Sequence, residues 1–232
     1  MKKIAFFVEG FTEQLFLTKL FEEVCAKGSL AITSIKGKGG GKIAISFTAI
    51  SAKAVTADTE YYVLIVDCSG ENNLRSYIND RREGLIREGY EKIIGIRDVY
   101  PNFNRNEIAK LLQGLNYKLP QLPIRTEFIL GVMEIEAWFL SEHTHFPRIH
   151  PNLNSVLIST SLNFNPETDD MELRDSPAQD LNAAYNLVGS DYNKEISTIE
   201  RTINSIDYAQ VFFNPKTNSV KALITELNSF VS

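Results

Sequence analysis

Cysteine, histidine and tryptophan are scarce in this chain of 232 residues, which contains two, three and one of them respectively. Cys25 and Cys68 form no metal-binding spacing, and so few cysteines are typical of a reducing compartment. An excess of positive charge is also lacking, because 29 acidic residues against 24 basic ones give a net charge of −5. No global positive field therefore attracts nucleic acid, and any contact with DNA or RNA would need a local basic patch or bridging cations.

Long apolar runs are absent as well. The N-terminal run KIAFFV, residues 3–8, is too short for the core of a signal peptide or for a membrane span. We therefore expect a cytoplasmic protein with no membrane partner. The rest of the composition, 44% hydrophobic and 23% charged, is that of an ordinary globular protein. A chain of this length can form one large domain, or one domain with an appendage.

Apolar runs of strand length alternate with segments of helical period along the first part of the chain. KGKGGGK, residues 36–42, is expected to form a flexible basic loop, and Thr12 is the expected N-cap of the first helix. This alternation predicts an α/β fold, with a Rossmann-like, mostly parallel sheet flanked by helices. Strands are expected at 3–8, 30–35, 61–66, 92–96 and 125–132, and helices after Thr12, at 43–55 and at 74–89.

From about residue 134 onward the pattern becomes helical and rich in loops. EIEAWFLSEH predicts a short amphipathic helix, residues 151–180 are polar, and residues 195–232 resemble two helices. We therefore divide the chain into an α/β core, residues 1–145, and a helical C-terminal extension, residues 146–232, packed on that core.

Acidic residues follow three of the predicted strands: Glu9, Asp67 and Asp98. Ligands of open α/β sheets gather at the carboxyl ends of strands, and carboxylates that meet there repel each other unless a cation or a shared proton offsets their charge. Mg²⁺ takes oxygen ligands and leaves room for a phosphate. A single acid at a strand end more often caps a helix or faces solvent. Glu13, one helical turn after Glu9, strengthens the interpretation as a site.

The motifs V-E-G-F-T-E, residues 8–13, and YYVLIVD, which ends at Asp67, resemble the TOPRIM domain. More narrowly, they resemble the stand-alone TOPRIM proteins related to the OLD and RloB nucleases of phage-defence systems. In those proteins a Glu of an EG-x-TE turn and a D-x-D after a later strand bind Mg²⁺ for phosphodiester chemistry. MEIEAWFL, residues 133–140, resembles their E-x-E-A-W-L-L element. The resemblance covers most of residues 1–145 and implies a TOPRIM-like sheet with Mg²⁺ or Mn²⁺ as cofactor.

The resemblance also implies roles for individual residues. Glu9 corresponds to the catalytic or metal-binding acid, Glu13 to the second acid of the turn, and Asp67 to the first acid of the D-x-D. The sequence departs from the pattern at Ser69, a weaker and neutral ligand where the second Asp is expected, and Glu71 could supply the missing charge. Supporting acids would be Asp98, Glu134 and Glu136, although the last two could equally be acids favoured at a helix N-terminus.

Basic residues that could contact a nucleic-acid backbone lie in the glycine-rich segment and on the helix after Asp67, where they could also simply face solvent. The glycine-rich segment is not a phosphate-binding P-loop, because Ile43 follows Lys42 where Ser or Thr is needed. ATP hydrolysis by this chain alone is therefore not expected. A zinc site at His143, His145 and His150 is disfavoured by their spacing. The candidate nucleic-acid-binding residues are Lys36, Lys38, Lys42, Arg75, Arg81 and Arg82.

The leading hypothesis is a Mg²⁺-dependent nuclease, or a nuclease subunit, that acts on DNA in preference to RNA in phage defence or DNA repair. The resemblance implies independent action or a separately encoded ATPase partner, and a homodimer is compatible with it. The alternative is a catalytically decayed TOPRIM-like interaction module that works through a protein partner, with Ser69 marking the decay. A phosphoacceptor domain using Asp67 ranks last, because no lysine follows the last strand at the expected place.

Overall fold

The computed structural model describes residues 1–25, 29–41 and 43–232, and these residues form two compact units. The first comprises residues 1–98, 106–130 and 226–232, and the second comprises residues 99–105 and 131–225. The sequence-based division at residue 145 does not coincide with these units.

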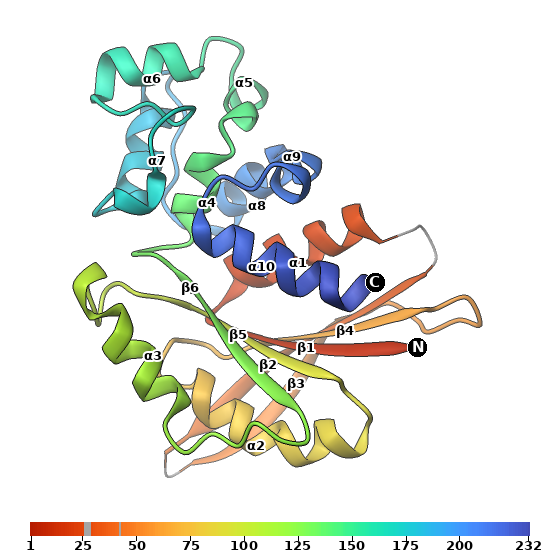
Figure 1. Ribbon diagram of the computed structural model, residues 1–232. Helices are drawn as coiled ribbons and strands as arrows, with labels where there is room; N and C mark the ends of the chain where they lie inside the picture. Colours follow the sequence, from red (N-terminus) through yellow and green to blue (C-terminus); the bar gives the residue numbers. More distant parts are fainter. Residues whose placement is uncertain (26–28, 42) are drawn as a thin grey trace. The chain divides into compact units, whose positions relative to one another are not determined.

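The strands are β1 (Lys2–Val8), β2 (Leu30–Gly40), β3 (Ile43–Ala52), β4 (Tyr61–Asp67), β5 (Lys92–Asp98) and β6 (Arg125–Gly131) (Figure 1). The helices are α1 (Phe11–Val24), α2 (Leu74–Arg87), α3 (Ile108–Asn116), α4 (Glu136–Ser141), α5 (Phe146–Ile149), α6 (Ser155–Leu162), α7 (Pro177–Asn186), α8 (Ile196–Ser205), α9 (Tyr208–Phe213) and α10 (Asn218–Val231), with short 3₁₀ turns at Arg105–Glu107, His143–His145 and Met171–Leu173.

The first unit contains a six-stranded sheet in the order β3-β2-β4-β1-β5-β6. β1 runs parallel to both β4 and β5, β2 runs parallel to β4, and only the β2–β3 pair is recorded as antiparallel among the paired strands that the structure describes. Helix α1 lies on one face of this sheet, and α2 and α3 lie on the other (Figure 1). The predicted α/β fold with a mostly parallel sheet flanked by helices is confirmed.

The central strands owe their position to continuous apolar runs, because a strand covered by helices on both faces has no polar side. The last five residues of β1 and of β4 are all buried. The connection from β1 through α1 leads to β2 on one side of β4, whereas the connection from β4 through α2 leads to β5 on the other side of β1. The chain therefore reverses its winding direction between β1 and β4, which makes the carboxyl ends of these two strands a topological switch point.

The prediction of a helix at 43–55 is wrong, because residues 43–52 form the edge strand β3. Ile43, Ile45 and Phe47 alternate with small or hydroxylated residues, which is the period of a strand. The ring of Phe47 packs edge-on against Tyr77 of α2, with 5.5 Å between the ring centroids. The prediction of a flexible loop is also wrong for residues 36–40, which continue β2, whereas Lys42 lies outside the described residues.

Tyr77 explains why β2 carries a glycine at residue 37. A Cβ atom on Gly37 would lie 2.0 Å from Cε2 of Tyr77, so only glycine leaves room for the ring. The Tyr77 hydroxyl donates a hydrogen bond of 2.9 Å to the carbonyl of Gly39, where φ is +100°. The glycine-rich segment is therefore the surface on which α2 packs.

We expect Gly37→Ala to lower the free energy of unfolding by about 1–3 kcal/mol, because the new methyl group must displace the Tyr77 ring or the hairpin. Urea unfolding measures this change. Gly114→Ala in α3 is the matched control, since its Cβ meets nothing within 4 Å, and it should leave stability unchanged or slightly raised. Equal stability of the two variants would show that the contact with Tyr77 is not tight in solution.

The second unit is helical and has its own core. Trp138 is buried, as expected for a core anchor, and its indole Nε1 donates to Ser219 Oγ at 2.6 Å. Glu172 accepts hydrogen bonds from the backbone amides of Asn218 and Ser219 in the first turn of α10. The prediction of two helices in residues 195–232 is wrong, since α8, α9 and α10 occupy this segment, and α6 forms within the polar stretch 151–180.

Candidate active site

The carboxyl ends of β2, β4 and β1 lie side by side in the sheet. Asp67 is in register with Val8 on one side and with Lys36 on the other. The backbone amide of Cys68 donates to the carbonyl of Val8, and that of Gly70 donates to the carbonyl of Glu9, each at 2.8 Å. These bonds hold the turn after β4 against the turn after β1, so the acids of both turns share the switch point.

Glu9 is the most perturbed acid of this site. Its Oε1 accepts a hydrogen bond of 3.0 Å from the backbone amide of Asp98 and lies 3.9 Å from Nε of Arg97. The pKa of Glu9 is raised from 4.5 to about 8, mainly by burial, then by the charge of Glu13 and least by that of Glu71. The Asp98 amide and Arg97 act in the opposite direction without cancelling this effect. Glu9 therefore tends to hold a proton at neutral pH.

Glu13 is buried in the first turn of α1, where its Oε2 accepts a hydrogen bond of 3.0 Å from the backbone amide of Gly10. Gly10, and not Thr12 as predicted, is the N-cap residue of this helix. The capping bond fixes the Glu13 carboxylate close enough to Glu9 to raise the pKa of that residue. The EG-x-TE turn thus positions two acids together, as the sequence predicts.

Asp67 and Ser69 form the other wall of the site. Asp67 is buried, its Oδ1 accepts a hydrogen bond of 2.7 Å from the Ser69 amide, and its Oδ2 lies 3.5 Å from Nζ of Lys36. Ser69 has a φ of +55°, and its hydroxyl donates to the carbonyl of Gly37 at 3.1 Å. The serine oxygen keeps its lone pairs available as an acceptor, but it is a neutral group at this position.

The thiol of Cys68 reports how closely the acids converge. Burial raises the pKa of this thiol, and the charge of Asp67 raises it further. Glu9 and Glu13 act on it in the same direction, so the acids of both turns surround one side chain. Cys68 itself is buried and serves as a small apolar neighbour of the site.

The residues predicted for the site divide between the two units. Glu134 and Glu136 lie in the second unit, where Lys194 Nζ approaches their Oε1 atoms at 3.2 and 3.1 Å. Glu134 also accepts from the amide of Ala178, and Glu136 accepts from the hydroxyl of Tyr192 at 2.7 Å. Their partners are thus found inside the second unit. The first unit holds Glu9, Glu13, Asp67, Ser69, Glu71 and Asp98.

Two basic residues lie at the site, and the sequence predicted only one of them. Lys36 was a candidate for contact with phosphate, and its side chain is 57% exposed beside Asp67. The sequence analysis did not assign Arg97 to the site. Its position before Asp98, at the end of a predicted strand, was the available signal, because a basic residue among strand-end acids can offset their charge. Both residues offset part of the negative charge of the cluster.

The acidic cluster suits a hard divalent cation by its chemistry. Within residues 1–25, 29–41 and 43–232, no group of three or more His, Cys, Asp or Glu side chains is placed so that it could hold a metal ion. The donors are nevertheless oxygen atoms, which Mg²⁺ and Mn²⁺ prefer. The raised pKa of Glu9 also shows a repulsion that a bound cation would relieve. The chemistry of these donors, and not their present arrangement, is therefore what favours such an ion.

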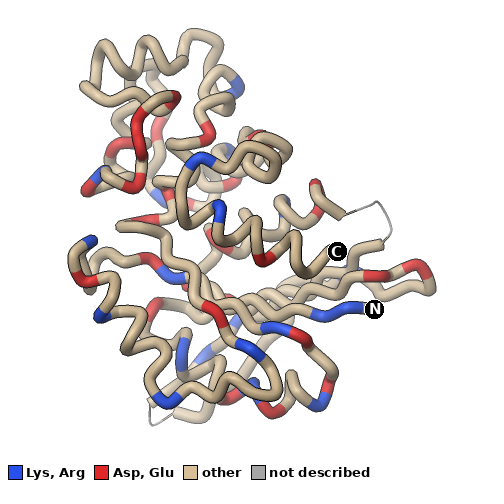
Figure 2. The backbone as a smooth tube through the Cα atoms, viewed as in Figure 1, with Lys and Arg blue, Asp and Glu red and all other residues tan. Residues whose placement is uncertain are grey.

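The remaining basic candidates are less uniform than predicted, and charges of both signs are spread along the chain (Figure 2). Lys38 is exposed on β2, Arg75 donates to the carbonyl of Tyr117, and the Arg81 guanidinium lies 5.0 Å from the centroid of the Phe47 ring. Arg82 is only 4% exposed and donates to Thr126 Oγ1 at 3.0 Å and to a neighbouring backbone carbonyl. The assignment of Arg82 to a nucleic-acid-binding surface is therefore wrong, because its charge is used to hold the start of β6.

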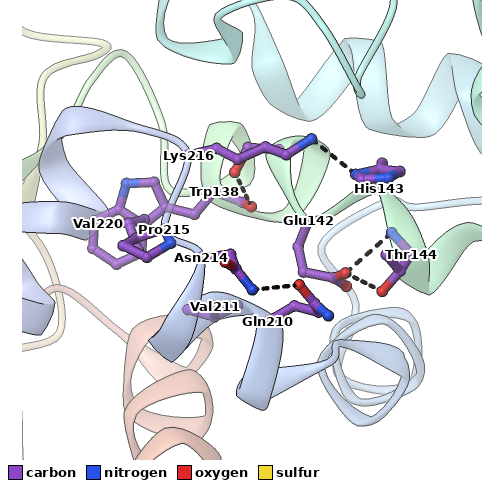
Figure 3. A pocket seen from close by; sticks show the side chains of 11 residues that line it. Trp138, Glu142, His143, Thr144, Gln210, Val211, Asn214, Pro215, Lys216 and Val220 are labelled. Carbon is purple, nitrogen blue, oxygen red and sulfur yellow. Dashed lines mark hydrogen bonds between the residues drawn. The ribbon is translucent and has the colours of Figure 1, made fainter.

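The three histidines do not converge in the structure. His145 is fully buried, bonded to the carbonyl of Glu142 and to the Tyr185 hydroxyl, and burial lowers its pKa to about 4. His143 Nδ1 is hydrogen-bonded to Lys216 Nζ at 3.0 Å, and both residues line, with Trp138, a cavity of about 50 Å³ within the second unit (Figure 3). A zinc site built from these residues is not supported.

Comparisons with known proteins add little to this geometry. No protein-family model matches the chain, and no curated protein matches it. A solved structure, the "putative cell surface hydrolase" from Lactobacillus plantarum WCFS1, aligns with 100% of this chain and 91% of its own at 10% identity and a TM-score of 0.35. A likeness of this extent carries no argument about function.

Among the described helices, none combines the length and apolar character needed to cross a membrane.

Proposed function

We propose that this protein is a Mg²⁺- or Mn²⁺-dependent nuclease, or a nuclease subunit, that hydrolyses phosphodiester bonds of DNA or RNA in phage defence or DNA repair. The observation that carries the proposal is the cluster of Glu9, Glu13 and Asp67 at the topological switch point, with the pKa of Glu9 raised to about 8 by burial and by its acidic neighbours. The resemblance of these turns to those of TOPRIM nucleases supports the same conclusion.

Glu9, Glu13 and Asp67 would hold the cation, with Ser69 and Glu71 as further oxygen donors. When bound, the cation would supply Lewis-acid polarisation of a phosphoryl oxygen and a water made more acidic. The residues of the chain orient these groups: the Gly10 amide fixes Glu13, and the Asp98 amide fixes Glu9. Lys36 is exposed enough to turn from Asp67 to a phosphate oxygen of the substrate, where its charge would stabilise the developing negative charge.

A second candidate function is a non-catalytic interaction module. The observation that favours it is the position of two cations, with Lys36 Nζ 3.5 Å from Asp67 and Arg97 Nε 3.9 Å from Glu9. In a decayed site, basic side chains would neutralise the carboxylates in place of the metal ion. Ser69, neutral and bonded to the Gly37 carbonyl, agrees with this alternative.

Cleavage assays distinguish these two functions. We expect the wild-type protein to cut supercoiled plasmid, single-stranded DNA or RNA with Mg²⁺ or Mn²⁺ and not with a chelator. Glu9→Ala and Asp67→Ala should each lower the rate by at least about a hundredfold, because each removes a proposed ligand. Glu22→Ala, an exposed acid of α1, is the matched control and should retain full activity.

The assay is performed on the full chain, with circular dichroism to show that each variant is folded. Cleavage that persists in both variants would remove these acids from the mechanism. Absence of cleavage on every substrate, together with identical calorimetric metal titrations of wild type and variants, would favour the interaction module.

A further inference from the structure

A pocket of about 570 Å³ lies in the first unit, between the β2–β3 hairpin and the start of α2. Its lining is mainly apolar and includes Ile50 of β3 and Tyr77 of α2, and two lysines of β2, Lys36 and Lys38, also line it. Sites for organic ligands have this size and this combination of apolar walls with a few polar groups. Apart from Lys36 and Ser69, the residues that line this pocket have no role in the proposed metal site.

The β2–β3 pair is irregular at one of the residues that line the pocket. Ile35 pairs with Ala49 and Ser34 pairs with Ser51, so Ile50 is an extra residue in β3. Such a β-bulge redirects a side chain and is common beside active sites. Tyr77 also lines the pocket, and its hydroxyl donates a hydrogen bond to the Gly39 carbonyl. Both apolar walls are thus set by the backbone of the hairpin.

The pocket adjoins the acidic site through shared residues. Lys36 lines the pocket and lies 3.5 Å from Asp67, and Ser69 lines it while its amide donates to the same carboxylate. Lys38 is exposed and carries a second positive charge to the lining. A ligand in this pocket would therefore meet apolar walls, two cations and the edge of the acidic cluster.

We propose that the pocket receives one unpaired nucleotide of the substrate, which makes single-stranded nucleic acid the substrate class of this protein. The inference rests on the proposed nuclease function. A base has an apolar face that suits Ile50 and Tyr77, and its adjoining phosphates suit Lys36 and Lys38. A base inside a duplex could enter only after it had left the stack, so paired strands bind this surface less well.

Binding is measured by fluorescence anisotropy with labelled oligonucleotides of about twelve nucleotides, single-stranded DNA, single-stranded RNA and duplex DNA. A chelator prevents cleavage, and the ionic strength is held constant. Ile50→Asp places a charge on the pocket wall, and Ile43→Asp makes the same change on the same strand outside the pocket. Both side chains are at least half exposed, at 50% and 71%, so neither substitution should prevent folding.

We expect the wild type to bind a single strand at least tenfold more tightly than the duplex. Ile50→Asp should weaken single-strand binding about tenfold or more, the effect of losing one base contact, whereas Ile43→Asp should change it less than twofold. Equal affinity for single strand and duplex, or equal effects of the two substitutions, would overturn the proposal. Displacement of the oligonucleotide by an equal concentration of mononucleotide would also overturn it, because the pocket would then serve a free nucleotide.

This experiment does not depend on catalysis. Selective binding of single strands with no cleavage under any condition would refute the proposed nuclease activity and support the proposed nucleotide pocket. Cleavage that is equally fast on single-stranded and duplex DNA, with no effect of Ile50→Asp, would support the proposed nuclease activity and refute the binding of a nucleotide in the pocket.

Discussion

Glu9→Gln is expected to make the protein more stable at pH 8, with a rise of about 10–20 °C in the midpoint of thermal unfolding in the presence of a chelator. The pKa of Glu9 is raised from 4.5 to about 8 in the folded state, first by burial and then by Glu13. Between these values the folded protein holds a proton that the unfolded chain has lost. Folding stability therefore falls as the pH rises through this window, by on the order of 5 kcal/mol in total.

Glutamine removes the buried charge and can still accept the hydrogen bond from the Asp98 amide. The advantage of the variant should consequently be small near pH 5, where Glu9 is protonated in the folded wild type, and should grow up to about pH 8. Thermal unfolding at five or six pH values measures this difference. Glu23→Gln, a change at an exposed acid of α1, is the control, and its unfolding curve should follow that of the wild type. Parallel pH profiles of wild type and Glu9→Gln would contradict the raised pKa.

The acidic turns were predictable because the responsible signals are local. A strand buried on both faces must be apolar throughout, so the acids directly after residues 3–8 and 61–66 mark where each strand leaves the core. In a parallel sheet these ends share one edge, which places Glu9 and Asp67 together without knowledge of the full strand order. The identity of the first helix followed from the same spacing, although its N-cap is Gly10.

The features that escaped prediction depend on contacts between distant parts of the chain. β3 alternates only over residues 43–48, and its position is set by pairing with β2 and by the contact of Phe47 with Tyr77. Residues 226–232 join the first unit because Phe230 packs on Tyr61 and Phe21, a contact that no local pattern records. Likewise, nothing near Arg82 in the sequence indicates that Thr126 accepts its hydrogen bond.

The same proton on Glu9 leads to a second large effect, on metal affinity. If Glu9 is a ligand of the proposed cation, the proton must leave when the ion binds, because only the carboxylate coordinates. Below pH 8 the dissociation constant for Mg²⁺ should thus decrease about tenfold for each unit of rising pH, and it should level off above about pH 8. From pH 6 to pH 8 the expected gain in affinity is about fiftyfold, because half of Glu9 is ionised at a pH equal to its pKa.

Isothermal titration calorimetry at pH 6, 7 and 8 measures this dependence. Repeating each titration in two buffers of different ionisation enthalpy gives the number of protons released, which should approach one at pH 6 and fall toward zero above pH 8. In Glu9→Gln the pH dependence should disappear together with most of the affinity, because the variant lacks both the proton and the charge. Mg²⁺ binding with no proton release in the wild type would place the ion away from Glu9, and a Glu13→Gln variant would then show whether the neighbouring acid holds it alone.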